Sequence, residues 1–310
     1  MSNKIYDGIM GLVVGDALGV PYEFMVREYI NCNCRDMTGF GTYNQPPGTW
    51  SDDSSMTLAT LVSLARNEGK INLEDIMNRF RGWLYDKLYT PHGVTFDVGH
   101  TTRCSIARYD IVKKNLDTCG GKALSDNGNG SLMRILPLAF VDTTDEDICA
   151  VSSLTHAHHI ATTACKIYVA IANALLHDVH KEDAVLDALG RYRHLMTTEF
   201  LRLFDIQNYS REVIQSDGYV IHTLEAALWC FLTTDNYSDC VLTAVNLGND
   251  TDTTAAVAGG LAGLYYGVGD ENEGIPEYWI EKIAKKEWIK DVCYNLDDIL
   301  EQKSEGETKK

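Results

Sequence analysis

The chain has 310 residues, a formal net charge of −17, 45% hydrophobic residues and nine cysteines without Cys-X-X-Cys spacing. Negative charge of this size repels nucleic acid and anionic lipid, so we expect neither as a binding surface. Scattered cysteines favour reduced thiols in a cytoplasmic protein over a disulfide framework. Asp7 and Asp16 interrupt the first apolar stretch, so we expect no signal peptide, and no apolar run is long enough to span a bilayer.

Helical periodicity dominates the chain, and alternating strand patterns with hairpin signals are scarce. Asn72 is a candidate N-cap for one of the predicted helices. The sequence predicts one compact all-α domain over residues 1–301, followed by a polar, disordered tail at residues 302–310. The periodic segments, in chain order, are residues 56–65, 72–84, 160–176, 218–233, 239–247 and 253–264.

The segment at residues 255–263 consists almost entirely of alanine and glycine. Small residues let neighbouring helix backbones approach closely, at some cost in helix propensity. We therefore expect this helix to lie centrally, with its N-terminus carrying Asp250 and Asp252 into a site. A buried helix without a functional role is compatible with the same composition.

Two short acidic clusters, far apart in the sequence, each open a predicted helix. Their carboxylates and hydroxyls are hard oxygen donors, which select Mg²⁺, Mn²⁺ or Ca²⁺ over zinc or copper. If the fold brings the clusters together, four aspartates can hold two divalent cations. The candidate ligands are Ser51, Asp52 and Asp53 in the first cluster and Asp250, Asp252 and Thr253 in the second.

Helix capping is the alternative explanation for each cluster, because Ser, Thr and Asp are ordinary N-cap residues and acids in the first turn favour the helix dipole. Capping needs only one side chain per helix, whereas each cluster has several. Adjacent carboxylates such as those of Asp52 and Asp53 repel each other, and a helix N-terminus supplies only about half a charge. Bound cations would neutralise these carboxylates more completely than a helix N-terminus does.

Two further carboxylates stand at breaks in the helical pattern. Glu23 follows Gly19 and Pro21 beside apolar residues, where it can ligate a metal or act as an acid or base. Asp97 lies where a loop enters a helix, so N-capping is the simpler explanation for it.

A glycine-rich stretch from Asp126 to Met133 precedes another predicted turn of helix. Its exposed backbone N–H groups suit a phosphate, although Asn-Gly is also a common turn. A histidine group, His156, His158 and His159, opens the helix at residue 160. No carboxylate or cysteine stands at the spacing of a zinc motif, so substrate contact or helix capping is favoured over zinc binding.

With these motifs in this order, the chain resembles the ADP-ribosylglycohydrolase family and looks closest to its bacterial dinitrogenase reductase-activating branch. The resemblance extends from near the N-terminus to about Gly267. It rests on the following stretches: Gly15–Gly19, Tyr22–Met25, Met37–Gly39, Ser51–Asp53, Asp97–Gly99, Gly128–Gly130, Met133–Arg134, Thr155–His156, Tyr219–Ile221 and Gly248–Thr254.

The resemblance implies an all-α fold with a binuclear Mg²⁺ or Mn²⁺ centre in a central cleft. It implies that the two clusters supply the metal ligands, that Glu23 lies beside the metals and that Asp97 lies near the scissile bond, so that Asp97 and Glu23 are the catalytic candidates. The implied substrate-binding residues are Asp126, Gly128, Asn129, Gly130, Ser131, Met133, His156 and Tyr219.

The implied reaction is metal-dependent hydrolysis of the glycosidic bond between ADP-ribose and an acceptor. Arginine of a modified protein is the first choice of acceptor because of Asp97, while serine, a modified nucleic acid and small conjugates remain open. The same residues are also compatible with a non-catalytic ADP-ribose-binding protein or with a nucleotide phosphohydrolase. Ser51 replaces a frequent Thr and keeps its hydroxyl, whereas His100 replaces a frequent Asn and can alter substrate selectivity.

Overall fold

The computed structural model describes residues 3–30, 34–112, 115–269 and 272–308, and within these ranges it forms helices and isolated bridges but no β-strand. The predicted all-α fold class is confirmed. The α-helices are α1 (Lys4–Gly19), α2 (Arg27–Ile30), α3 (Asp52–Arg66), α4 (Leu73–Asp86), α5 (His100–Ile111), α6 (Asp145–Ser153), α7 (His159–Leu176), α8 (Lys181–Tyr192), α9 (Val220–Thr233), α10 (Tyr237–Val245), α11 (Thr251–Tyr266), α12 (Glu277–Ile280) and α13 (Lys286–Thr308).

Short 3₁₀ helices connect these elements. Those that bear on the site are η1 (Val20–Tyr22), η2 (Gly41–Tyr43) and η5 (Asn129–Arg134). The others are η3 (Leu116–Thr118), η4 (Leu124–Asp126), η6 (Leu136–Phe140), η7 (Arg193–Leu195), η8 (Thr198–Asn208) and η9 (Arg211–Val213).

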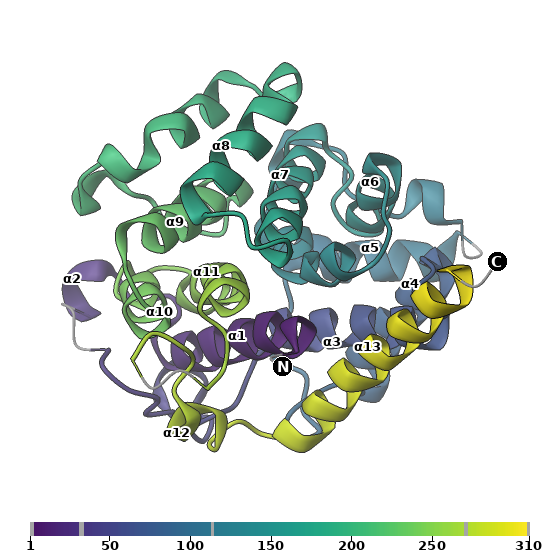
Figure 1. Cartoon of the computed structure of the whole chain (residues 1–310), viewed down its shortest axis with the longest axis horizontal. Coiled ribbons are helices and arrows are strands. Elements are labelled where there is room, and N and C mark those ends of the chain that lie inside the picture. The colour runs from purple at the N-terminus through teal and green to yellow at the C-terminus, as the bar shows by residue number, and fades with distance from the viewer. Residues whose placement is uncertain (1–2, 31–33, 113–114, 270–271, 309–310) are drawn as a thin grey trace.

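Helices α1 and α11 form the centre of the molecule, where they lie against each other (Figure 1). The pair packs so closely that a Cβ atom on Gly15 would lie 2.1 Å from the carbonyl oxygen of Ala255. At Gly19, an added Cβ would lie 2.3 Å from the Cα atom of Asp252. Glycines on one helix and small residues on the other thus bring the end of α1 against the start of α11.

The remaining helices enclose this pair. Helix α3 packs against α1, α4 and α13, while α7, α9 and α10 pack around α11 (Figure 1). The η5 segment contacts α3, α7, α9 and α11. The N-termini of α3 and α11 and the η5 segment therefore meet near the C-terminal end of α1.

Helix α7 is the one described helix that is long and apolar enough to cross a membrane by length and composition. Within the protein it packs against α6, α8, α9 and α11, and most of its residues are buried. This is the environment of a core helix.

The helix boundaries follow local capping more closely than apolar periodicity. Asn72 caps α4, because its side chain accepts a hydrogen bond from the Asp75 backbone N–H at 3.0 Å. Asn236 likewise accepts from the Asp239 N–H at 2.8 Å, so α10 begins two residues before the predicted start.

Helix α13 continues through Thr308, although the composition of residues 302–310 predicts a disordered tail. The Lys303 ammonium group donates a hydrogen bond to the carbonyl oxygen of Glu68, in the turn after α3. This contact holds the polar end of the helix against the domain. Residues 309 and 310 lie outside the described ranges.

Candidate metal centre and active site

The first acidic cluster is fixed by a buried aspartate of α1. Asp16 accepts hydrogen bonds from the backbone N–H groups of Ser51 at 2.9 Å and Ser54 at 3.0 Å, and from the Ser54 hydroxyl at 2.5 Å. Ser51 is the N-cap of α3 and accepts from the Asp53 N–H at 3.3 Å. Ser51 therefore caps α3, and the carboxylates of Asp52 and Asp53 are not needed for capping.

The second cluster is fixed at the start of α11. The Thr251 hydroxyl donates to the carbonyl oxygen of Gly19 at 2.8 Å, which joins α11 to the end of α1. Asp250 occupies the N-cap position but makes no capping hydrogen bond with its side chain. The Thr253 hydroxyl donates to Asp53 Oδ2 at 3.3 Å, so the two distant clusters are in direct contact.

The carboxylates converge in two overlapping groups. One oxygen from each of Asp16, Asp53 and Asp252 lies within 4.8 Å of the others, and the same holds for Glu23, Asp97 and Asp252. Asp53 and Asp252 are fully buried. Asp53 Oδ1, Asp252 Oδ2 and Glu23 Oε2 are buried without a hydrogen-bond partner. Unpartnered carboxylate oxygens in such number fit hard divalent cations.

The electrostatics of the cluster require positive charge. Burial, followed by the charge of Asp97, raises the pKa of Glu23 to about 9. Burial and neighbouring carboxylates also raise the pKa of Asp52, Asp53 and Asp252 well above the usual range. In the described part of the chain, no lysine or arginine forms an ion pair with any of these groups. A bound cation is the remaining means of stabilising their ionised forms.

A cavity of about 340 Å³ opens beside the carboxylates. Ten of the residues predicted for the site line it, and the acidic ones are Glu23, Asp52, Asp97 and Asp250. The other predicted residues in its wall are Gly128, Asn129, Gly130, Met133, His156 and Thr253. Ser51, Asp53 and Asp252 are buried and are not among the described residues that line it.

The glycine-rich loop forms another wall. Asn129 donates from its amide nitrogen to Asp250 Oδ2 at 2.7 Å and to the Thr223 hydroxyl at 2.9 Å, which ties the loop to the second cluster. A Cβ atom on Gly130 would lie 2.8 Å from His156 Cε1, so this position admits only glycine without displacement. The Asn129 N–H is bonded to the carbonyl oxygen of Gly218 at 3.0 Å, so it does not face a ligand.

Two of the three histidines have the two predicted kinds of position, one at the cavity and one at a helix cap. His156 lines the cavity, and its Nδ1 lies 2.8 Å from the Thr155 hydroxyl. Burial, together with the nearby Arg134, lowers the pKa of His156 to about 3, so its imidazole is neutral. His158 caps α7 by accepting from the Ile160 N–H. Neither belongs to a group of metal-ligating atoms within the described ranges.

Three residues predicted to bind substrate are absent from the described residues that line the cavity. Asp126 accepts from the Ala123 N–H at 2.9 Å, and the buried Ser131 hydroxyl accepts from a neighbouring serine. The Tyr219 hydroxyl donates to Glu199 Oε2 at 2.8 Å. All three are engaged by neighbouring parts of the fold.

Asp97 does not cap α5, because Gly99 occupies the N-cap position. Its backbone has a φ of 51°, which is uncommon for a residue other than glycine, although aspartate tolerates it better than most. Capping does not explain this strained backbone conformation. Asp97 lines the cavity, and strained backbone of this kind is often found at functional sites.

Sequence reasoning missed the part that Asp16 plays in the site and did not identify Phe24 as part of the cavity wall. A charged residue within the apolar, glycine-containing helix α1 is a signal that Asp16 shares with Asp7, and the structure shows which of the two reaches the first acidic cluster. No sequence pattern distinguishes Phe24 from a core phenylalanine, and only the structure places it at the cavity.

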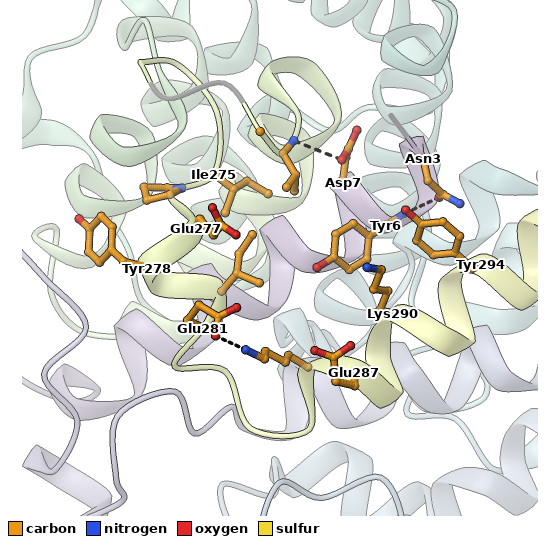
Figure 2. Close-up of a pocket in the computed structure, with 15 residues that line it drawn as sticks. Asn3, Tyr6, Asp7, Ile275, Glu277, Tyr278, Glu281, Glu287, Lys290 and Tyr294 are labelled. Carbon is orange, nitrogen blue, oxygen red and sulfur yellow. Dashed lines mark hydrogen bonds and ion pairs between the residues drawn. The ribbon is translucent and has the colours of Figure 1, made fainter. Parts of the chain in front are cut away.

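A larger cavity of about 620 Å³ lies at the opposite end of α1, where Tyr6 and Asp7 face α12 and α13 (Figure 2). Asp7 Oδ1 accepts from the Val268 N–H at 3.2 Å, and Glu281 forms an ion pair with Lys286. Among the described residues, none of those lining it belongs to a carboxylate group suited to a metal. The candidate active site is therefore the smaller cavity.

Comparison with known proteins agrees with the geometry. A sequence model of the family described as ADP-ribosylglycohydrolase matches residues 1–308. An ADP-ribosylarginine hydrolase of Pseudomonas putida is 32% identical over 302 residues, covering 96% of this chain and 78% of that protein. The ADP-ribosyl-dinitrogen reductase glycohydrolase of Rhodospirillum rubrum is 33% identical over 292 residues, covering 92% and 91%.

A solved structure described as an ADP-ribosylglycohydrolase-related protein complex superimposes with a TM-score of 0.81 and 27% identity, covering 96% of this chain and 98% of that chain. The fold, the full-length family match and the relatives at more than 30% identity agree with one another. The chain therefore belongs to the ADP-ribosylglycohydrolase family.

Proposed function

We propose that the protein hydrolyses the glycosidic bond between ADP-ribose and the guanidine group of arginine in modified proteins. The observation that carries the proposal is the convergence of Asp53 and Asp252, each with an unpartnered buried oxygen, beside a cavity lined by Glu23 and Asp97. Membership of the family and the similarity to an ADP-ribosylarginine hydrolase support the choice of bond and acceptor.

Two Mg²⁺ or Mn²⁺ ions are the proposed cofactors. Asp52, Asp53, Asp250 and Asp252 would hold them, with the hydroxyls of Ser51 and Thr253 as additional oxygen donors. Four carboxylates match the four positive charges of two divalent ions. When bound, such ions act as Lewis acids and lower the pKa of coordinated water.

In the reaction, the bond between the anomeric carbon and the guanidine nitrogen breaks, and the oxygen of a water molecule bonds to that carbon. One proton of the water is lost and the departing nitrogen gains one. Glu23 and Asp97 are the carboxylates that line the cavity outside the two clusters, so they are the proposed groups that move these protons. Positive charge that develops on the ribose faces the carboxylate-lined wall.

The ADP-ribose is proposed to lie along the glycine-rich wall of the cavity. Gly128 and Gly130 leave room for a close approach, and the neutral His156 adds no negative charge beside the diphosphate. Asn129 positions this wall through its bond to Asp250. The protein partner is thus an ADP-ribosylated protein, and we place the enzyme in the cytoplasm, which the eight free cysteines of the described residues support.

The test is a panel of ADP-ribosylated peptides that carry the modification on arginine or on serine, with the products separated by chromatography. The proposal expects Mg²⁺- or Mn²⁺-dependent release of free ADP-ribose from the arginine peptide. Release of AMP or phosphate would instead identify a phosphohydrolase. Binding of ADP-ribose without turnover of any conjugate would identify a binding protein.

A further inference from the structure

Phe24 is exposed at the cavity although its backbone is held in an unfavourable conformation. Phe24 is 69% exposed and its φ is 64°, a left-handed region that is unfavourable for a residue other than glycine. Two backbone hydrogen bonds fix this conformation, from the Phe24 N–H to the Asn249 carbonyl and from the Asn249 N–H to the Met25 carbonyl at 2.7 Å. An exposed ring contributes little to core packing, so its position calls for another explanation.

The ring of Tyr43 contacts Phe24, and Phe96 in turn contacts Tyr43. Tyr43, at the end of η2, lies edge-on to Phe24 with the ring centroids 6.4 Å apart. Phe96, in the loop before α5, lies 4.9 Å from the ring of Tyr43. Burial and the nearby carboxylates raise the pKa of the Tyr43 phenol above its usual range, so the ring stays neutral. We call Phe24, Tyr43 and Phe96 the aromatic rim.

The rim stands beside negative charge. Phe24 lines the same cavity as Glu23 and Asp97, while Asp97 directly follows Phe96 in the sequence. An aromatic face attracts a cation, and nearby carboxylates add to that attraction. A guanidinium group suits this environment best, since it is planar, weakly hydrated and able to stack on a ring while it pairs with carboxylates. A neutral hydroxyl acceptor gains neither interaction.

We infer that the aromatic rim, with Phe24 as its contact residue, is a subsite for the guanidinium group of the acceptor arginine. The inference rests on the proposed function and assigns its preference for arginine to an aromatic ring rather than to the proposed metal ligands. Tyr43 and Phe96 act as positioning residues that hold Phe24 at the cavity.

The experiment compares Phe24→Ala, Phe24→Leu and Phe24→Trp with the wild-type protein in the presence of Mg²⁺. The KM for an ADP-ribosylarginine peptide should rise about three- to tenfold in the Ala and Leu variants, with a smaller change in kcat, and should stay near the wild-type value in Trp. Tyr278→Ala removes a ring that is 56% exposed at the other cavity and serves as the matched control.

Binding measurements separate the subsite from turnover. Calorimetry with agmatine, added to protein that holds ADP-ribose and Mg²⁺, should show the same three- to tenfold loss of affinity in the Ala and Leu variants. The Kd for ADP-ribose alone should be unchanged, which also establishes that the variants are folded. Agmatine binding that is undetectable in the wild-type protein, or equal in all variants, would overturn the subsite. Phe24-dependent agmatine binding in a protein that releases no ADP-ribose from arginine would overturn only the proposed function.

Discussion

The two cavities lie at opposite ends of α1, a helix of 16 residues and about 24 Å, and they differ in whether their buried charges have partners. At the Tyr6 end, Asp7 and Glu281 have partners, and Lys290 lies over the ring of Tyr294 (Figure 2). At the Gly19 end, buried carboxylates face one another with oxygens left unpartnered. Among the described residues that line the larger cavity, none has a buried side-chain nitrogen or oxygen without a hydrogen-bond partner, so we call it the satisfied cavity. Unbalanced buried charge identifies the site better than volume does.

The largest expected effect tests whether the carboxylate cluster at the Gly19 end of α1 is catalytic. Asp252→Asn and Asp52→Asn should each lower the release of ADP-ribose from an arginine peptide about a thousandfold or more, because each removes a charge that the centre requires. Glu277→Gln, at the satisfied cavity, is the matched control and should turn over like wild type. Full activity of either aspartate variant, after chelation and return of Mg²⁺, would refute the account.

Gly130→Ala tests the close packing of the glycine-rich wall. The added Cβ would lie 2.8 Å from His156 Cε1 and 3.1 Å from the Thr102 hydroxyl, so the wall must shift. We expect kcat/KM to fall about a hundredfold, the scale of a misplacement near 1 Å. Gly190→Ala, where an added Cβ meets nothing within 4 Å, should leave kcat/KM unchanged. Equal values for the two variants would exclude a close approach of substrate to Gly130.

Metal binding should stabilise the protein through the carboxylate cluster at the Gly19 end of α1 alone. A cation at about 100 times its Kd adds about 2.7 kcal/mol, which raises Tm by about 4 °C in a domain of this size. Scanning calorimetry of EDTA-treated protein with Mg²⁺ returned should show this rise. The rise should be absent in Asp252→Asn and retained in Glu277→Gln. A rise of the same size in all three proteins would place the stabilising metal elsewhere.

The metal-free protein should lose stability as pH rises. The pKa of Glu23 is raised to about 9 from an ordinary 4.5, and that of buried Asp16 to about 6 from 3.8. Raised carboxyl pKa values mean that the folded state holds these protons more tightly than the unfolded state does. The stability they contribute is therefore complete below about pH 4 and is lost through about pH 6 for Asp16 and about pH 9 for Glu23.

Thermal melts of EDTA-treated protein between pH 5 and pH 9 provide the measurement. Tm should decrease across this range, with a smaller decrease in Glu23→Gln and in wild type with saturating Mg²⁺. A Tm that increases with pH in the absence of metal would contradict the charge distribution described for the site.

The smallest effect is expected at the satisfied cavity itself. Glu281→Gln removes the ion pair with Lys286, whose partners are both partly exposed to solvent. Exposed pairs contribute about 1 kcal/mol or less, so the free energy of unfolding in urea should change by no more than that. A loss of several kcal/mol would mean that this end also holds strongly coupled charge.

Much of the fold could be predicted from local patterns. Apolar periodicity located α3, α4, α7, α9, α10 and α11, and the small residues of α11 predicted its close contact with a neighbour. The identity of that neighbour could not be predicted, because the glycines of α1 do not indicate which helix packs against them. Residues 302–308 continue α13, and their polar composition did not indicate where that helix ends.

The candidate site also has features that the sequence indicated and features that only the structure shows. The repulsion between the adjacent carboxylates of Asp52 and Asp53 was enough to indicate a counterion, whereas only the family resemblance implied that the two clusters share one centre; the contact between Thr253 and Asp53 brings them together. The positions of Asp126, Ser131 and Tyr219 depend on partners such as Glu199, and no pattern in the sequence identifies such partners. Asp16 was visible as a charge in an apolar helix, whereas its bonds to Ser51 and Ser54 follow only from the packing of α1 on α3.

Anomalous diffraction at the manganese edge, from crystals of the full chain soaked in Mn²⁺, would locate the metal ions themselves. Two peaks are expected among the carboxylates of Asp52, Asp53, Asp250 and Asp252, and none at the cavity between α12 and α13. Crystals that show no peak among these carboxylates at saturating Mn²⁺, or peaks only at the larger cavity, would contradict the proposed metal centre.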